Sequence, residues 1–220
     1  MLMSEARRYS ILLADELTLF RESLAVLCES DGRFDVVAQC GDGEAATGLI
    51  RSLEPDIAIL DLALPKLFTL EVVRKVRQAG VATRLVVIAQ RRDRKTVLEV
   101  LRSGANAFVL KSGPSAHLLE SFQQVLDGGI YVSPQVELDK VFASRNKQEP
   151  EDPLETLSAR EYQVFSLLID GIRAKEIAAR LELSPKTVDT YRASLMRKLD
   201  IHDVAGLVKY AIHRNLTSLA

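Results

Sequence analysis

The chain has 220 residues, of which 47% are hydrophobic and 27% charged, so it can bury a full core without disulfides or a structural metal. This length predicts one or two domains. Cys28 and Cys40 are too few for a disulfide framework, and no stretch reaches the ~18 apolar residues of a membrane span. Because the first residues also lack an apolar signal segment, we expect a cytoplasmic protein with no membrane partner.

The formal net charge of −1 is unevenly distributed along the chain. Residues 1–153 carry 19 basic and 22 acidic side chains, whereas residues 154–220 carry 10 basic and 8 acidic ones. The second part is therefore mildly basic. Such a charge permits nucleic-acid binding but does not demonstrate it.

Five short apolar runs in the first 130 residues predict β-strands. They are Tyr9–Ala14, Asp35–Cys40, Asp56–Asp61, Arg84–Ala89 and Ala107–Lys111. Three of these runs consist almost entirely of Ile, Leu, Val and Ala, which is typical of strands that are covered on both faces. The runs therefore favour a parallel sheet.

Amphipathic segments that follow these runs predict five helices. They are Leu19–Glu29, Glu44–Leu53, Leu67–Ala79, Arg94–Ser103 and Ser115–Asp127. Gly80, Gly104 and Gly128 stand where helix ends need a left-handed residue. Five strand–helix units predict a doubly wound α/β domain over residues 1–131, with helices on both faces of a five-stranded parallel sheet.

The character of the sequence changes after residue 131. Residues 132–153 contain an amphipathic piece and then the polar, proline-containing stretch NKQEPEDP, which predicts a linker with a short helix. From residue 154 to 220 the pattern is purely helical. We expect a second, all-α domain there.

Charged residues stand at the ends of three predicted strands. Asp15 and Glu16 end the first run, Asp61 ends the third, and Lys111 ends the fifth. Ligands bind at the carboxyl ends of the strands in a doubly wound sheet, so these side chains should converge. Converging carboxylates repel one another, and an oxygen-only set suits Mg²⁺. The alternative is that each acid merely caps a helix or faces solvent.

Three sequence stretches, ILLADELTLFRESL, ILDLALP and FVLKSG, resemble the receiver domain of bacterial response regulators over residues 9–131. The resemblance implies a flavodoxin-like fold, with Asp61 as acceptor of a phosphoryl group from a sensor histidine kinase. It also implies that Asp15, Glu16, Asp61 and the carbonyl of Ala63 bind Mg²⁺, that Lys111 contacts the phosphoryl group, and that Phe108 is the aromatic switch residue.

The chain departs from the receiver pattern at several positions. Ala89 stands where receivers place Ser or Thr, which removes a charge-assisted hydrogen bond worth roughly 1.5–3 kcal/mol. Lys66, Phe68 and Thr69 replace the usual Gly, small polar residue and Gly, and Leu17 with Thr18 replaces a usual His-Pro pair. The resemblance therefore implies phosphorylation at Asp61 but leaves open how strongly phosphorylation switches the protein.

The second domain is predicted to hold four helices. Ser158 and Glu161 form a capping box that opens a helix through Asp170, followed by Ala174–Leu181. Ser184 then caps a helix that has Pro185 in its first turn and runs to about Leu199. A fourth helix is predicted over Val204–Asn215. Two short helices, a tight turn and a longer third helix are typical of a helix-turn-helix.

The third of these helices has two different faces. Val188, Leu195 and Leu199 should pack inward, the opposite face is largely polar, and the helix as a whole carries a net charge of +3. Basic side chains there would bind phosphates, while others could contact base edges. The candidate DNA-binding residues in and near this helix are Lys175, Lys186, Thr187, Asp189, Thr190, Arg192, Ala193, Arg197 and Lys198. A basic, solvated helix in an α-helical bundle is the alternative.

The stretches LSAREYQV, KEIAARL, SPKTVDTYR and MRKL resemble the LuxR-type DNA-binding domain, and a receiver followed by this domain is the architecture of NarL/FixJ-type response regulators. The resemblance implies a transcriptional regulator that binds double-stranded DNA as a homodimer and is not an enzyme. It also implies that the last helix dimerises, with Val204, Val208 and Ile212 as candidate contacts. Arg173 and Ala174 depart from the capping Ser and the Asn that are usual there.

Two alternative hypotheses about the function of the chain remain. The chain could bind DNA without a phosphorylation switch, because Ala89 lacks a hydroxyl. It could instead be a metal-dependent phosphatase that uses the acidic cluster, although no general base accompanies the acids. The histidines at 117, 202 and 213 have neither nucleophile nor metal-ligand spacing, and we interpret them as surface or packing residues.

Overall fold

A computed structural model of the chain describes residues 8–90, 92–136, 153–214 and 216. The chain divides into two compact units, Met1–Val141 and Phe142–Ala220. This division falls inside the segment 132–153 that the sequence predicts to be a linker. Most of the stretch predicted to form a short helix in that segment lies outside the described residues.

The first unit contains a parallel β-sheet. Its strands are β1 (Tyr9–Ala14), β2 (Phe34–Cys40), β3 (Ile57–Asp61), β4 (Arg84–Ala89), β5 (Ala107–Leu110) and β6 (Tyr131–Val132). They lie in the order β2-β1-β3-β4-β5-β6, and every neighbouring pair is parallel. The five predicted strands are confirmed to within one residue at each end. The sixth strand, β6, was not predicted, because two residues are too few to show a periodic pattern.

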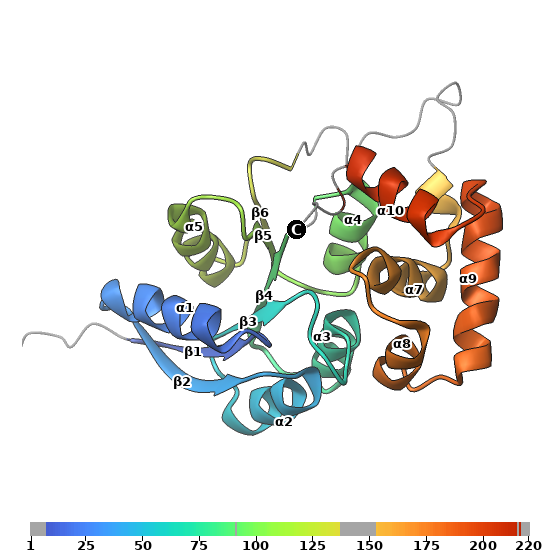
Figure 1. The fold of residues 1–220 in the computed structure, drawn as a ribbon. Coiled ribbons are helices and arrows are strands. Elements are labelled where there is room, and N and C mark those ends of the chain that lie inside the picture. Colours follow the sequence, from blue (N-terminus) through green and yellow to red (C-terminus); the bar gives the residue numbers. More distant parts are fainter. Residues whose placement is uncertain (1–7, 91, 137–152, 215, 217–220) are drawn as a thin grey trace, which may run out of the picture. The chain divides into compact units, whose positions relative to one another are not determined.

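Five helices cover the two faces of the sheet, as predicted (Figure 1). They are α1 (Thr18–Ser30), α2 (Gly43–Leu53), α3 (Thr69–Gln78), α4 (Arg94–Arg102) and α5 (Ser115–Leu126). One apolar core lies between the sheet and α2, α3 and α4, and a second lies between the sheet and α1 and α5. Alternate residues of β1, β3, β4 and β5 enter opposite cores, which explains the uninterrupted apolar runs.

Local signals in the sequence set most helix ends. The Asp42 and Asp93 side chains cap α2 and α4 by accepting hydrogen bonds from the backbone N–H groups of Ala45 and Thr96. The predicted left-handed residue Gly104 has φ +105° after α4. The largest difference is at α3, which begins at Thr69 instead of Leu67 because the backbone is still extended at Phe68.

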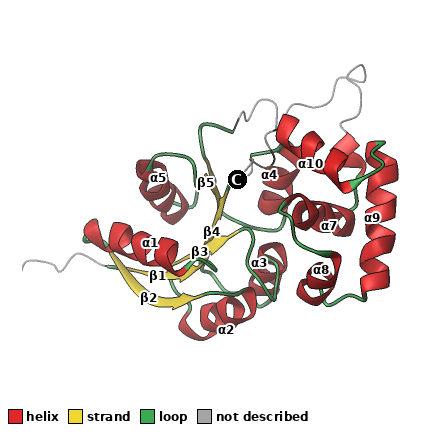
Figure 2. Ribbon diagram, in the orientation of Figure 1, coloured by secondary structure: helices red, strands yellow, loops and turns green. Residues whose placement is uncertain are grey.

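The second unit is all-α, as predicted, with four α-helices in its described part (Figure 2). A 3-10 helix, η1 (Pro153–Thr156), precedes α7 (Ala159–Ile169), α8 (Ala174–Arg180), α9 (Pro185–Leu199) and α10 (Val204–His213). The predicted capping box on α7 is present in full. Among the described helices of the chain, none has the length and apolar character needed to cross a lipid bilayer.

Candidate functional site

The carboxyl ends of the strands bring together three of the charged residues predicted to form a site. The Lys111 Nζ atom lies 2.7 Å from Asp15 Oδ2 and 3.0 Å from Asp61 Oδ1. The Asp15 side chain is 1% exposed, that of Lys111 11% and that of Asp61 13%. Because β1 and β3 are neighbours and β5 lies beyond β4, Lys111 reaches across the end of β4 to meet both acids.

The electrostatics of this cluster follow from its burial. Burial raises the pKa of Asp61 above its usual value, the Lys111 ammonium opposes that rise, and the Asp15 charge adds to it. The Lys111 ammonium also lies 4.5 Å from the centre of the Phe20 ring. The result is a largely buried cation held between two carboxylates, with Asp61 the more exposed of the two.

Hydrogen bonds fix the backbone on either side of the acids. Asp15 Oδ1 accepts from the backbone N–H of Leu17 at 2.9 Å, and the Asp15 carbonyl accepts from Arg21 at 2.6 Å. The Thr69 hydroxyl donates to the carbonyl of Asp61. Thr69, which the sequence analysis noted only as a departure from the receiver pattern, therefore ties the first turn of α3 to the end of β3.

The residues after β6 support the strand that carries Lys111. The fully buried Ser133 hydroxyl accepts a hydrogen bond of 2.9 Å from the backbone N–H of Leu110, and the Ser133 N–H donates to the Phe108 carbonyl at 2.9 Å. These contacts extend the sheet beyond β5 at the point where Lys111 leaves it. Nothing in the sequence near Ser133 identifies this role, since a lone serine after a glycine pair is typical of a loop.

The donor set fits a hard divalent cation in its chemistry. Asp15, Glu16 and Asp61 offer only oxygen ligands, and one ammonium leaves the cluster negatively charged. Glu16, however, is exposed, and within the described residues no three His, Cys, Asp or Glu side chains form a ready-made metal site. Mg²⁺ commonly uses one or two carboxylates and keeps several waters, so the Asp15 and Asp61 pair suffices.

The unusual loop between β3 and α3 is held by contacts of its own. Lys66 has φ +64°, a left-handed conformation that explains why glycine is usual there. Its ammonium lies 2.7 Å from Asp42 Oδ2, and the Gly43 N–H donates to the Pro65 carbonyl at 3.0 Å. A Cβ atom on Gly43 would lie 1.9 Å from the Leu67 carbonyl oxygen, so only glycine fits where α2 meets this loop.

The two predicted switch positions are both buried. Ala89, at the end of β4, is 1% exposed, and its carbonyl accepts a 2.8 Å hydrogen bond from the Lys111 N–H. The Phe108 side chain is fully buried in the core formed with α2, α3 and α4. The structure therefore has the aromatic ring in an inward position, and the Ala89 carbonyl ties the end of β4 to the backbone of Lys111.

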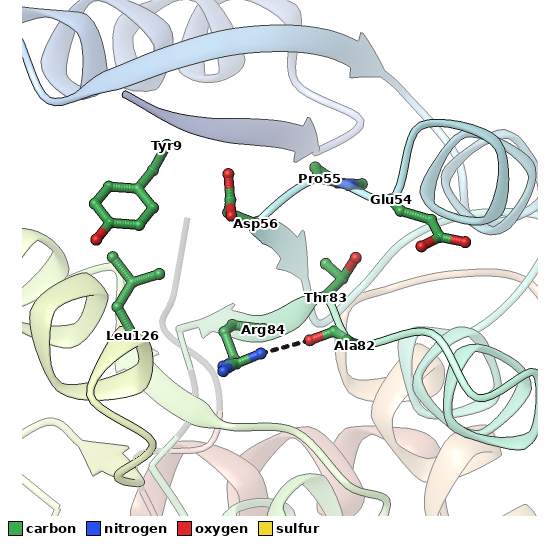
Figure 3. A pocket seen from close by; sticks show the side chains of 8 residues that line it. All are labelled: Tyr9, Glu54, Pro55, Asp56, Ala82, Thr83, Arg84 and Leu126. Atoms are coloured by element: carbon green, nitrogen blue, oxygen red, sulfur yellow. Dashed lines mark hydrogen bonds between the residues drawn. The ribbon is translucent and has the colours of Figure 1, made fainter. Parts of the chain in front are cut away.

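A separate cavity of about 350 Å³ opens at the amino ends of the strands, opposite the acidic cluster. The residues around it come from the starts of β1, β3 and β4 and from the end of α5 (Figure 3). Arg84 lines the cavity and donates to the Ala82 carbonyl at 2.7 Å. Because Asp61 stands at the carboxyl end of β3, this cavity is not part of the acidic cluster.

In the second unit, α9 has the two faces predicted for it. Val188, Leu195 and Leu199 are buried. The exposed candidates on α9 are Lys186, Asp189, Thr190, Ala193, Arg197 and Lys198, and Lys175 on α8 is exposed as well. The inward packing of one side thus leaves a polar, mainly basic side free to meet a partner.

Several of the predicted DNA-binding side chains are engaged within the domain. Arg192 lies 3.3 Å from Asp189, and the Thr187 hydroxyl lies 2.7 Å from that of Ser184. Lys198 differs most from the others, because its ammonium lies 2.6 Å from Glu161 Oε2 on α7. Arg173 makes no side-chain cap at the start of α8, as its departure from the usual serine implies.

The last helix also divides into two sides. Leu207 and Ala211 are fully buried. Val204 is 39% exposed, and Val208 and Ile212 are half-buried. The three residues predicted to dimerise therefore retain apolar surface that the domain does not cover.

Comparison with known proteins identifies both units. Residues 11–123 match the family described as response regulator receiver domain, and residues 155–211 match the family described as bacterial regulatory proteins of the luxR family. The chain is a response regulator. A receiver domain together with a luxR-family domain makes it a DNA-binding transcriptional regulator that is controlled by phosphorylation.

Relatives of this response regulator cover nearly its whole length. It is 34% identical over 209 residues to a transcriptional regulator of Pseudomonas aeruginosa. The aligned residues cover 94% of this chain and 98% of the relative. It is 29% identical over 212 residues to the oxygen regulatory protein NreC of Staphylococcus aureus, with the same coverage. A structure of the RcsB response regulator of Salmonella typhimurium shares its fold, with a TM-score of 0.78 at 21% identity over 94% of this chain and 98% of that one.

Proposed function

We propose that phosphorylation of Asp61 by a sensor histidine kinase controls DNA binding by α9. The observation that carries this proposal is the Lys111 ammonium held 2.7 Å from Asp15 and 3.0 Å from Asp61. In the proposed reaction, an Asp61 oxygen bonds to the phosphorus of a phosphohistidine while the phosphorus–nitrogen bond breaks, and the imidazole takes up a proton. The acid that accepts the phosphoryl group thus has a fixed cation beside it.

The neighbours of Asp61 have separate roles in this proposal. Asp15, Glu16, Asp61 and the Ala63 carbonyl would hold Mg²⁺, which neutralises charge on the phosphoryl oxygens. Lys111 exchanges its hydrogen bond with Asp61 for one with a phosphoryl oxygen. Because Lys111 directly follows β5, this exchange provides a path from the phosphoryl group to the strand that contains Phe108.

DNA recognition is assigned to the exposed side of α9. Lys186 and Arg197 supply positive charge for phosphates, and Thr190 and Ala193 offer methyl groups to thymine. The acidic Asp189 could accept from cytosine, although its contact with Arg192 must then open. We place this regulator in the cytoplasm as a homodimer on DNA, joined through the apolar surface of Val204, Val208 and Ile212.

Acetyl phosphate provides a direct test of the chemistry at Asp61. With Mg²⁺ present, the full chain is expected to gain the mass of one phosphoryl group, and Asp61→Asn is expected to gain none because its amide is not a nucleophile. Asp127→Asn, which changes an exposed acid elsewhere, serves as the matched control and should be labelled like the wild type. Equal labelling of Asp61→Asn and the wild type would refute the proposal.

A second candidate function is DNA binding without a phosphorylation switch, and Ala89 is the observation that favours it. A methyl group at the end of β4 cannot bond a phosphoryl oxygen. Equal affinities of the wild type and Asp61→Asn for DNA, unchanged by acetyl phosphate, would support this function over the first.

Restoring the missing hydroxyl separates the two functions more sharply. Ala89→Thr is expected to increase the effect of phosphorylation on DNA affinity by about tenfold, because one charge-assisted hydrogen bond is added in the phosphorylated state. Binding to duplex DNA selected by the wild type is measured with and without acetyl phosphate. Ala89→Val, which adds similar volume without a hydroxyl, should give no such increase.

A further inference from the structure

A partly buried polar cluster joins α7 to α9, in which the Lys198 side chain keeps 33% of its surface exposed. The Glu161 side chain on α7 is 7% exposed, and both of its carboxylate oxygens are used. Oε1 accepts from the Ser194 hydroxyl at 2.6 Å, while Oε2 accepts from the Lys198 ammonium and from the Ser158 N–H, each at 2.6 Å. We call Glu161, Ser194 and Lys198 the α7–α9 anchor.

The Lys198 ammonium donates hydrogen bonds to two different elements of the domain. Besides Glu161, it donates to the Thr156 carbonyl in η1 at 3.0 Å. Ser194 and Lys198 are four residues apart, so they lie one turn apart on the same side of α9. By contrast, Arg197 is exposed and makes no hydrogen bond or ion pair within the described residues. Lys198 is therefore bonded within the domain, whereas the neighbouring Arg197 is exposed to solvent without such bonds in the described part of the chain.

The anchor constrains α9 in a way that its apolar contacts do not. Val188, Leu195 and Leu199 bury one side of the helix, but apolar packing is not directional. Hydrogen bonds from two successive turns of α9 to one carboxylate are directional and fix both the rotation of the helix about its axis and its position along α7. Lys198 thereby sets where the exposed residues of α9 point.

We infer that Lys198 is a positioning residue, which orients α9 for DNA through Glu161, in place of the phosphate contact that the sequence predicts. This inference rests on the DNA-binding role proposed for α9. A phosphate contact at Lys198 would require its two bonds to Glu161 and Thr156 to break first. Glu161 would then keep its charge in a nearly buried position.

The salt dependence of DNA affinity tests this inference, because each phosphate contact adds about 0.9 to the slope of log affinity against log salt concentration. The full-length wild type is compared with Lys198→Gln, Lys198→Arg, Ser194→Ala and Arg197→Gln on a duplex selected by the wild type from a random pool. Affinities are measured at a temperature where circular dichroism shows each variant fully folded.

Lys198→Gln and Ser194→Ala are expected to lower DNA affinity by about tenfold with an unchanged salt slope, since each removes a hydrogen bond of the anchor. Lys198→Arg should restore affinity because a guanidinium can still pair with Glu161. Arg197→Gln should instead reduce the slope by about 0.9, as expected for a phosphate contact. Ser194→Ala retains every charge and keeps the test decisive if Lys198→Gln does not fold.

Two results would overturn the inference. A slope reduced by about 0.9 in Lys198→Gln would make Lys198 a phosphate contact. Unchanged affinity in folded Lys198→Gln and Ser194→Ala would mean that the anchor only stabilises the domain. A wild type that selects no DNA from the pool would overturn the proposed function as well, and that outcome is distinguishable from the other two.

Discussion

Replacing Arg77 by alanine is expected to lower the free energy of unfolding of the receiver unit by about 2–4 kcal/mol, because a half-buried side chain loses several charge-assisted hydrogen bonds. Arg77 on α3 donates to the carbonyls of Gly104 at 2.8 Å and Thr83 at 2.9 Å, and to Asn106 Oδ1 at 2.6 Å. Burial lowers the pKa of Arg77, yet each of its three side-chain nitrogens donates a hydrogen bond. Its loss removes these donors from the carbonyls of Gly104, Thr83 and Val81, whereas Asn106 Oδ1 still accepts from the Leu85 N–H.

Urea unfolding of the full chain, with hydrogen exchange of the β4 and β5 peptides to identify the receiver transition, measures this effect. Lys75→Ala removes an exposed cation from the same helix and should change stability by less than about 0.5 kcal/mol. Arg77→Lys should remain destabilised, because an ammonium cannot match the geometry of the guanidinium. A loss below about 1 kcal/mol in Arg77→Ala would contradict the structural role assigned to this network.

The second large effect is expected in acid. Burial alone would raise the pKa of Glu161, but hydrogen bonds from Lys198, Ser194 and Ser158 lower it to about 2, against a usual value of 4.5. A carboxylate with a lowered pKa in the folded state contributes stability above pH 4.5, and this contribution is lost as the pH falls towards 2. Glu161 should therefore contribute roughly 3 kcal/mol to the second unit at pH 7.

Glu161→Gln is expected to destabilise the second unit by roughly this amount at pH 7 and to reduce the loss of stability between pH 5 and pH 2. Unfolding is followed by hydrogen exchange of the α7 and α9 peptides in the full chain. Glu182→Gln, which changes an exposed acid between α8 and α9, is the matched control and should retain the wild-type acid dependence. If both variants showed the same acid dependence, the buried contacts of Glu161 would not be the source of stability.

Much of the local structure follows from short-range signals. Apolar runs with no alternation predict strands buried on both faces, and Asp61 at the end of one of them is predictable because the run stops at a charged residue. Ser158 with Glu161, and Ser184 with Pro185, predict helix starts that the structure confirms. The errors lie where no local signal exists, as at the two-residue β6.

The candidate site was predictable in its main members but not in its support. Asp15, Asp61 and Lys111 come together because the carboxyl ends of parallel strands lie on the same side of the sheet. A parallel sheet is enough to predict this convergence. The sequence also placed Glu16 beside them, whereas the structure leaves it exposed. Thr69 and Ser133 were not predicted as supports, since one hydroxyl in a loop carries no pattern.

The sequence by itself therefore determined the division into two units, the longer helices and strands of each, and which sides of α9 and α10 are apolar, because these depend on residue periodicity and on caps within a few positions. Only the tertiary structure decided the partners of the charged side chains. Lys198 and Arg197 are adjacent and both basic, yet one meets Glu161, 37 residues away in the chain, and the other meets solvent. Such a pairing depends on how helices are oriented in space, and no local pattern encodes that orientation.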